Sequence, residues 1–192
     1  MADNAPGAGG SPDTELASAV VLITGVMASG KSTVAQALAE RLPRTVHVRG
    51  DVFRRMVVSG RAEMRPGADE EAAAQLRLRY RLSASVADLY ADEGWTAVVQ
   101  DTVLGAQLTE YVSLVRTRPM YVVVLAPDRR TVTAREAGRA KTGYGADWTL
   151  ESLDRVLREE TPRLGLWLDT SGLDVAETVD TILAGLDGAR VH

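Results

Sequence analysis

The pattern of apolar and polar positions divides the chain into short strands and longer helices. Continuous apolar runs, typical of strands buried on both faces of a parallel sheet, alternate with segments in which apolar residues recur at helical spacing. The predicted strands are residues 19–24, 45–49, 96–100, 120–126 and 165–169. The predicted helices are residues 31–41, 51–59, 70–92, 106–117, 128–139, 150–160 and 174–186. This alternation predicts an α/β fold with a parallel sheet, helices on both of its faces and ligands at the carboxyl ends of the strands.

The first 18 residues differ in composition from the rest of the chain. The segment MADNAPGAGGSPDTELAS is rich in Gly, Ala, Pro and Ser and holds few large apolar side chains. Such a segment buries too little surface to offset the entropy lost on ordering. We therefore expect residues 1–18 to form a flexible N-terminal tail and residues 19–192 to form one domain, a size typical of single domains.

Composition narrows the classes of function. The chain has no cysteine, which excludes disulfides, zinc fingers, iron–sulfur clusters and thiol nucleophiles. Its two histidines, His47 and His192, argue against a multi-histidine metal site, and the net charge of −4 argues against nucleic acid as a partner. The sequence shows neither an apolar run of roughly 18 residues nor a basic start followed by an apolar stretch. We expect a cytoplasmic protein with no membrane partner, and the oligomeric state stays open.

The strongest motif follows the first predicted strand. Residues 25–32, GVMASGKS, match GxxxxGKS and lead directly into a predicted helix. In this motif backbone N–H groups and the helix N-terminus hold phosphates, the lysine reaches the β- and γ-phosphates, and the following hydroxyl binds Mg²⁺. We predict an ATP site with Mg²⁺, although GTP stays possible, with Lys31 in catalysis and Ser32 at the metal. The predicted nucleotide-binding residues here are Gly25, Ala28, Ser29, Gly30, Lys31, Ser32 and Thr33.

Two absences favour a kinase over other phosphate-loop proteins. Switch GTPases use an NKxD motif, but the only asparagine is Asn4, in the predicted tail. Motor-type ATPases usually place a glutamate after the Walker B aspartate, but the third predicted strand ends in Gln100-Asp101-Thr102. The pattern therefore favours transfer of phosphate to another molecule rather than to water.

Residues at the ends of the second and third strands are candidates for the acceptor site. Asp51 follows the second strand, where a carboxylate would accept the proton of an acceptor hydroxyl; its alternative role is to cap the next helix. Arg54 is a candidate for binding an anionic or polar acceptor, with a solvated arginine as the alternative. Asp101 resembles a Walker B aspartate and is a candidate ligand of Mg²⁺ or of the acceptor, with a turn or cap as the alternative.

A basic segment after the fourth strand predicts a lid. Arg135 and Arg139 lie four residues apart on one helical face, and Lys141 and a glycine-rich stretch follow. We expect the two arginines to bind the nucleotide and Arg135 to balance charge on the transferring phosphoryl group, with a solvated basic helix end as the alternative. The turn at residues 169–172 is expected near the nucleotide base.

Four segments together resemble a known family. The segments that carry this resemblance are ITGVMASGKST, HVRGDVFRRM, VVQDTVLGA and VLAPDRRTVTAREAGRAKTGYG. Through them the chain resembles the chloramphenicol phosphotransferase-like P-loop kinases from about residue 20 to residue 186. The resemblance implies a P-loop NTPase sheet of five strands in the order 2-3-1-4-5 with a small lid. It also implies that Asp51 is the base and that the acceptor is an antibiotic or related metabolite. The chain departs from the family at Gln100-Asp101, where the chloramphenicol enzyme is closer to Asp-Asp.

The sequence therefore predicts an ATP- and Mg²⁺-dependent O-phosphotransferase acting on a small-molecule hydroxyl. Zeta-toxin-like nucleotide-sugar kinases, gluconate kinases and adenylylsulfate kinases share the same skeleton and remain alternatives. A further alternative, from another class, is a module that senses ATP without turning it over.

Overall fold

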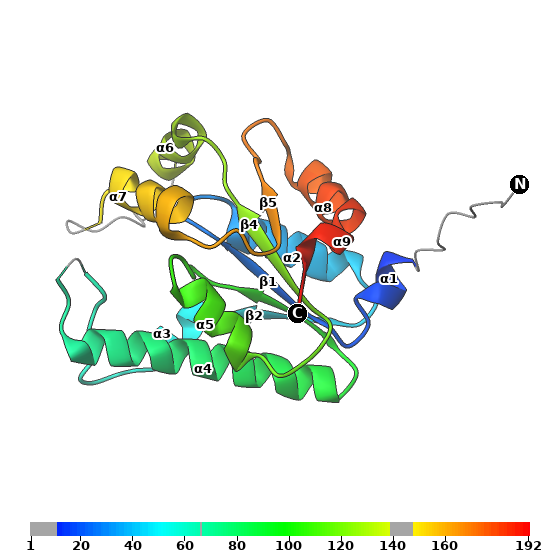
Figure 1. Cartoon of the computed structure of the whole chain (residues 1–192), viewed down its shortest axis with the longest axis horizontal. Helices are drawn as coiled ribbons and strands as arrows, with labels where there is room; N and C mark the ends of the chain where they lie inside the picture. The colour runs from blue at the N-terminus through cyan, green and yellow to red at the C-terminus, as the bar shows by residue number, and fades with distance from the viewer. Residues whose placement is uncertain (1–10, 66, 139–147) are drawn as a thin grey trace, which may run out of the picture.

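The computed structural model describes residues 11–65, 67–138 and 148–192, which form an α/β fold (Figure 1). The sheet order is β2-β3-β1-β4-β5, all parallel, which confirms the predicted fold class. A short sixth strand, which the sequence pattern did not predict, pairs antiparallel with β4. The strands are β1 (Val20–Gly25), β2 (Thr45–Arg49), β3 (Thr96–Gln100), β4 (Met120–Leu125), β5 (Leu166–Leu168) and β6 (Arg190–Val191).

Apart from α1, which lies in the predicted tail, and the short α9, the helices follow the predicted segments, with differences at their ends. They are α1 (Pro12–Glu15), α2 (Lys31–Arg41), α3 (Gly50–Arg55), α4 (Glu70–Asp92), α5 (Gln107–Leu114), α6 (Arg129–Ala137), α7 (Leu150–Arg155), the π-helical turn η1 (Val156–Glu160), α8 (Val175–Ala184) and α9 (Leu186–Ala189). The segments 31–41 and 70–92 were predicted with their observed bounds. In contrast, α3 ends four residues before the predicted 59, ahead of two β-branched valines and Gly60 at φ +73°. Among the described residues, no helix combines the length and the apolar composition that crossing a membrane requires.

Two apolar cores lie on opposite faces of the sheet. On one face β3 contributes Val98, which packs with residues of α2 and α8, and on the other face Val99 packs with residues of α4 and α5. This alternation follows from the two-residue period of a strand. The same alternation determines on which face of the sheet the side chains that follow Val99 lie.

The core extends further towards the N-terminus than composition suggested. Leu16 is fully buried among residues of the core beneath α2, and its carbonyl accepts a hydrogen bond of 2.5 Å from the Thr96 hydroxyl. The Tyr121 hydroxyl likewise donates to the carbonyl of Glu15. Glu15 and Leu16 therefore contact the domain, although the pattern placed the domain boundary at residue 19. The rest of the predicted tail, residues 1–10, lies outside the described residues.

Candidate active site

The loop between β1 and α2 has the backbone shape that phosphate binding requires. Gly25, Ala28 and Gly30 have positive φ angles of 143°, 62° and 100°. A side chain at Gly25 would collide with the carbonyl oxygen of Leu125 and lie 2.8 Å from the hydroxyl of Ser29. Such turns bring successive N–H groups to one side of the loop and form an anion-binding concavity. The motif thus folds as its glycines predict.

Polar groups inside this loop fit a phosphate ligand. Lys31 is 7% exposed, and its Nζ donates to the carbonyl oxygens of Gly25 at 2.9 Å and Val26 at 2.8 Å. The Ser29 hydroxyl is buried without a hydrogen-bond partner among the described residues. A buried hydroxyl without a partner is costly, so the loop offers both a cation and an unsatisfied donor to an anion.

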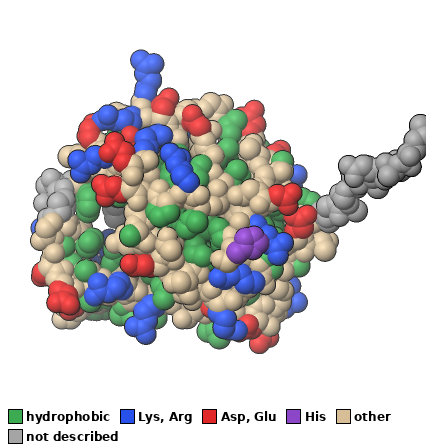
Figure 2. Space-filling model, in the orientation of Figure 1, with side chains coloured by type: hydrophobic (Ala, Val, Ile, Leu, Met, Phe, Trp, Pro, Cys, Tyr) green, Lys and Arg blue, Asp and Glu red, His purple; other side chains and the backbone are tan. Residues whose placement is uncertain are grey.

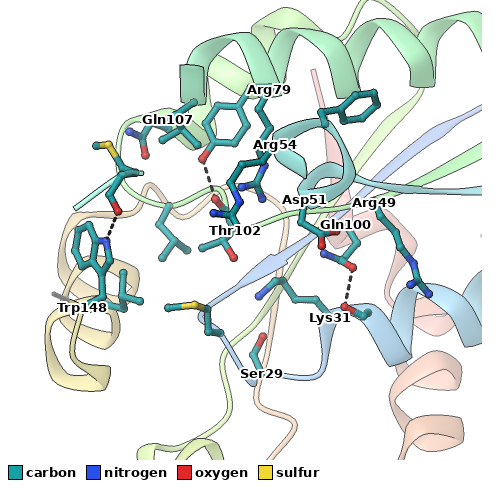
Figure 3. A pocket seen from close by; sticks show the side chains of 18 of the residues that line it. Ser29, Lys31, Arg49, Asp51, Arg54, Arg79, Gln100, Thr102, Gln107 and Trp148 are labelled. Carbon is teal, nitrogen blue, oxygen red and sulfur yellow. Dashed lines mark hydrogen bonds between the residues drawn. The ribbon is translucent and has the colours of Figure 1, made fainter. Parts of the chain in front are cut away.

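The loop forms one wall of a cavity of about 1630 Å³ above the carboxyl ends of the strands (Figure 3). The opposite wall comes from α3, α4 and the loop between them. The structure brings most of the predicted site residues to this cavity. Those that line it are Ala28, Ser29, Gly30, Lys31, Ser32, Thr33, Asp51, Arg54 and Arg135.

Asp51 lies in the first turn of α3 and faces the cavity. Its carboxylate is 44% exposed and pairs with Arg55 Nη2 at 2.9 Å. The alternative role is not observed, because α3 has no side-chain cap and Asp51 lies inside the helix. The carboxylate is therefore accessible to a molecule bound in the cavity, as a general base must be.

Asp101 lies elsewhere than predicted. Its side chain is fully buried and does not line the cavity. It accepts hydrogen bonds from Nε of Arg79 at 2.8 Å, from Nη2 of the same residue, and from the Thr102 N–H at 2.6 Å. Asp101 lies two residues after Val99, and so on the α4 face of β3. In this arrangement its oxygens are taken by the protein, and the predicted role as ligand of Mg²⁺ or acceptor has no support.

Arg79 is a site residue that the sequence pattern did not single out. It lines the cavity from α4 and holds Asp101 in a bidentate ion pair. Burial alone would lower the pKa of Arg79, but the adjacent Asp101 outweighs that effect and holds the pKa above its usual value. Gly50 is packed so closely on Asp101 that a side chain at position 50 would displace the carboxylate. The ion pair therefore supports the start of α3, which carries Asp51.

Gln100 was also missed. Its side chain is 7% exposed, and its Oε1 accepts a hydrogen bond of 2.7 Å from the hydroxyl of Ser32. The alternation along β3 was the available signal, because it places Gln100 on the same face as Val98, towards α2. The amide therefore lies beside the predicted metal-binding hydroxyl.

Two of the three predicted arginines, Arg54 and Arg135, line the cavity but differ in their partners. Arg54 forms an ion pair with Glu63, from the loop between α3 and α4. Arg135 donates to the carbonyl oxygens of Ser29 at 3.2 Å and Thr170 at 3.0 Å, and so joins the phosphate loop to the turn after β5. The Thr170 hydroxyl in that turn is buried without a partner among the described residues.

Parts of the predicted lid lie beyond the described residues, namely Arg139 and Lys141. Directly after this segment, Nε1 of Trp148 donates to the carbonyl oxygen of Met64 at 2.9 Å. Both residues line the cavity, and the bond links the side of α7 to the loop between α3 and α4 (Figure 3).

The side chains around the loop fit a magnesium ion that arrives with a nucleotide. Among the described residues there is no group of three or more His, Asp and Glu side chains suited to hold a metal. Ser32 presents a hydroxyl at the start of α2, and Mg²⁺ is commonly held by few protein oxygens together with substrate phosphates and water.

Solved structures share this fold at low sequence identity. A sugar kinase from Janibacter sp. HTCC2649 is 21% identical, with 89% of this chain and 95% of that chain covered and a TM-score of 0.62. The APS kinase of Mycobacterium tuberculosis is 17% identical over 88% and 96% of the two chains, with a TM-score of 0.62. The tunicamycin resistance protein of Deinococcus radiodurans is 17% identical over 90% and 98%, also at 0.62. The chain thus has a P-loop kinase-like fold.

Sequence comparison supplies the family. No curated protein matches the chain. A family model described as an AAA domain matches residues 20–162, which is more than half of the chain and spans β1 to the end of η1. The chain therefore belongs to this AAA domain family.

Proposed function

We propose that the protein is an ATP-dependent O-phosphotransferase that acts on a hydroxyl of a small molecule. The observation that carries this proposal is that Lys31 of the phosphate loop and Asp51 of α3 line the same cavity. A cation for phosphates and an accessible carboxylate are the two groups that phosphoryl transfer to an alcohol requires. A module that only senses ATP would need no accessible carboxylate opposite the phosphate loop.

The nucleotide half is built by the loop and Arg135. The loop N–H groups and Lys31 would hold the phosphates of ATP, while Arg135, which already contacts the loop, would balance charge on the transferring group. A magnesium ion held by Ser32 and the phosphates would supply further charge neutralisation. GTP is the alternative nucleotide.

The acceptor half lies between α3 and α4. Asp51 would accept the proton of the acceptor hydroxyl as its oxygen bonds to the γ-phosphorus and the bond to the ADP oxygen breaks. Arg54 lines this half and would bind a polar or anionic group of the acceptor. The new phosphate ester and ADP are the products.

We propose an antibiotic or related metabolite as the acceptor, which the resemblance to chloramphenicol phosphotransferase-like kinases supports, as does the structural neighbour named for tunicamycin resistance. The arginines of the acceptor half favour a second candidate, an anionic metabolite. Arg54, Arg55 and Arg79 have carboxylate partners, but Arg77 lines the cavity with no ion-pair partner among the described residues. Arg77 is exposed, and the anionic group of a sugar acid or of adenylylsulfate would pair with it.

We further propose that the protein works in the cytoplasm, where ATP is abundant, without a nucleic-acid or membrane partner. On the face shown in Figure 2, basic and acidic side chains are interspersed. A nucleic-acid surface would instead gather its basic residues into a patch or stripe.

Label transfer from γ-labelled ATP with Mg²⁺ tests the proposal. The acceptor panel contains chloramphenicol, tunicamycin, gluconate, adenylylsulfate and UDP-N-acetylglucosamine. A labelled product that is absent with Lys31→Met supports the proposal and names the acceptor class. Nucleotide binding without product from any acceptor would favour the ATP-sensing alternative, whereas absence of nucleotide binding would refute the proposal.

A separate prediction concerns Arg135. Arg135→Met removes the side chain that contacts the Ser29 and Thr170 carbonyl oxygens. We expect ATP binding to weaken about ten- to a hundredfold, because one charge-assisted contact is worth about 1.5–3 kcal/mol. Fluorescence titration with N-methylanthraniloyl-ATP measures it. The control is Arg130→Met, an exposed arginine of the same helix outside the cavity; equal affinities for the two variants would contradict the assignment.

A further inference from the structure

The end of β3 presents two polar side chains to opposite faces of the sheet. Gln100 follows the register of Val98 and faces α2, whereas Asp101 follows the register of Val99 and faces α4. Only the α2 face carries Ser32. The side chain beside the metal-binding hydroxyl is therefore an amide, and the neighbouring carboxylate points to the other side of the strand.

The contact between Gln100 and Ser32 is well defined. The Ser32 hydroxyl donates to Gln100 Oε1 at 2.7 Å, and Gln100 is 7% exposed in the interior of the sheet. By donating its proton to the amide, the hydroxyl keeps its lone pairs for another ligand. In P-loop proteins generally, a Ser or Thr and an acidic side chain hold Mg²⁺ together. Here the acidic side chain is missing from that place.

Asp101 is not available to replace it. Both of its oxygens accept hydrogen bonds from Arg79, and Gly50 packs directly against the carboxylate. Turning Asp101 towards Ser32 would leave Arg79 without its partner in a buried position, which is strongly unfavourable. The Ser32 hydroxyl therefore has the Gln100 amide, and not Asp101, as its hydrogen-bond acceptor.

We propose that Gln100 is the positioning residue for Ser32 at the magnesium site and that, because β3 presents an amide to this hydroxyl in place of a carboxylate, the affinity for Mg²⁺ depends on the charge of the nucleotide phosphates. The proposal rests on the nucleotide half of the proposed function. A neutral amide orients the hydroxyl but contributes no charge, and Mg²⁺ gives up its water reluctantly. The phosphates must then supply the charge, in agreement with the absence of an acidic cluster among the described residues.

Two substitutions at position 100 separate orientation from charge. Gln100→Glu keeps the size and the acceptor oxygen and adds a negative charge. The measured quantity is the Mg²⁺ concentration at which half of the metal's effect on nucleotide affinity is reached. We expect this concentration to fall about tenfold in Gln100→Glu. Gln100→Met keeps the length but removes the acceptor. We expect it to raise that concentration about tenfold while leaving the affinity measured in EDTA within about twofold.

The experiment titrates N-methylanthraniloyl-ATP into each variant in EDTA and at rising Mg²⁺, and follows Mn²⁺ binding without nucleotide by electron paramagnetic resonance. The matched control is Gln36→Glu, which adds the same charge one turn along α2, where Gln36 contacts Glu40 and His47 rather than Ser32. Thermal unfolding confirms that each variant is folded; if Gln100→Met is unfolded, Gln100→Glu carries the test alone.

We expect wild-type protein to bind no Mn²⁺ in the absence of nucleotide and Gln100→Glu to gain a measurable affinity. Equal Mg²⁺ dependence in wild type and Gln100→Glu would overturn the proposal, as would an equal shift of the Mg²⁺ dependence in Gln36→Glu. Tight Mn²⁺ binding by the wild-type protein in the absence of nucleotide would also overturn it. These results differ from a complete lack of nucleotide binding, which would refute the proposed function itself.

Discussion

Replacing Asp51 by asparagine is expected to lower the rate of phosphoryl transfer about 10²–10⁴-fold, the contribution typical of a general base. The side chain keeps its size, and an amide does not accept the proton of the acceptor hydroxyl. Nucleotide affinity should change less than about twofold, because Asp51 belongs to α3 and not to the phosphate loop, whose N–H groups and Lys31 would hold the phosphates. Single-turnover label transfer, with the acceptor found in the panel, measures the loss directly.

The matched control for Asp51 is Glu110→Gln. Glu110 is an exposed residue of α5 whose side chain also lines the cavity, so its substitution removes the same charge from the same space. We expect this variant to retain activity within about twofold. If Asp51→Asn retained full activity, or if both variants lost it equally, the carboxylate of Asp51 would not be the base.

The second large effect concerns stability. Arg79→Met removes the partner of Asp101, whose carboxylate is fully buried. An unpaired buried charge is costly, and breaking such a pair typically destabilises a protein by about 3–5 kcal/mol. The free energy of unfolding measured in urea should fall by that amount. Because the ion pair supports the start of α3, we also expect transfer activity to fall at temperatures where the variant remains folded.

Two further variants test the cause of this destabilisation. The double substitution Arg79→Met with Asp101→Asn removes both charges, and we expect it to recover most of the lost stability. Arg81→Met changes an exposed arginine two residues along α4 and should alter stability by no more than about 0.5 kcal/mol. A loss in Arg81→Met as large as that in Arg79→Met would show that the effect belongs to the helix rather than to the pair.

Local pattern was sufficient for the framework of the fold. The segments 31–41 and 70–92 were predicted as helices from the spacing of their apolar residues, and the structure begins and ends α2 and α4 at those residues. The phosphate loop was predictable because its chemistry depends on the backbone and on neighbours in sequence. Leu16 shows the limit of composition, since one large apolar side chain in a polar segment is enough to anchor it in the core.

Contacts between distant segments were the part that the sequence did not reveal. Arg79 stands among other arginines of α4, and nothing in its sequence neighbourhood distinguishes it from exposed Arg77 and Arg81. Asp101 was placed in the site because it follows a strand end, although the two-residue period of β3 directs it to the other face. The same alternation places Gln100, one residue before Asp101, on the face towards α2 and Ser32, and would have identified it as a site residue.

The two hydrogen bonds that hold the Lys31 ammonium have a thermodynamic consequence for ligand binding. In the free protein this side chain is already withdrawn from solvent and fixed by two carbonyl oxygens. Immobilising a lysine costs up to about 2 kcal/mol of conformational entropy, and here folding has met that cost before any ligand arrives. An incoming anion therefore meets a partner that needs little dehydration or ordering, so we expect the association free energy to retain most of the electrostatic gain.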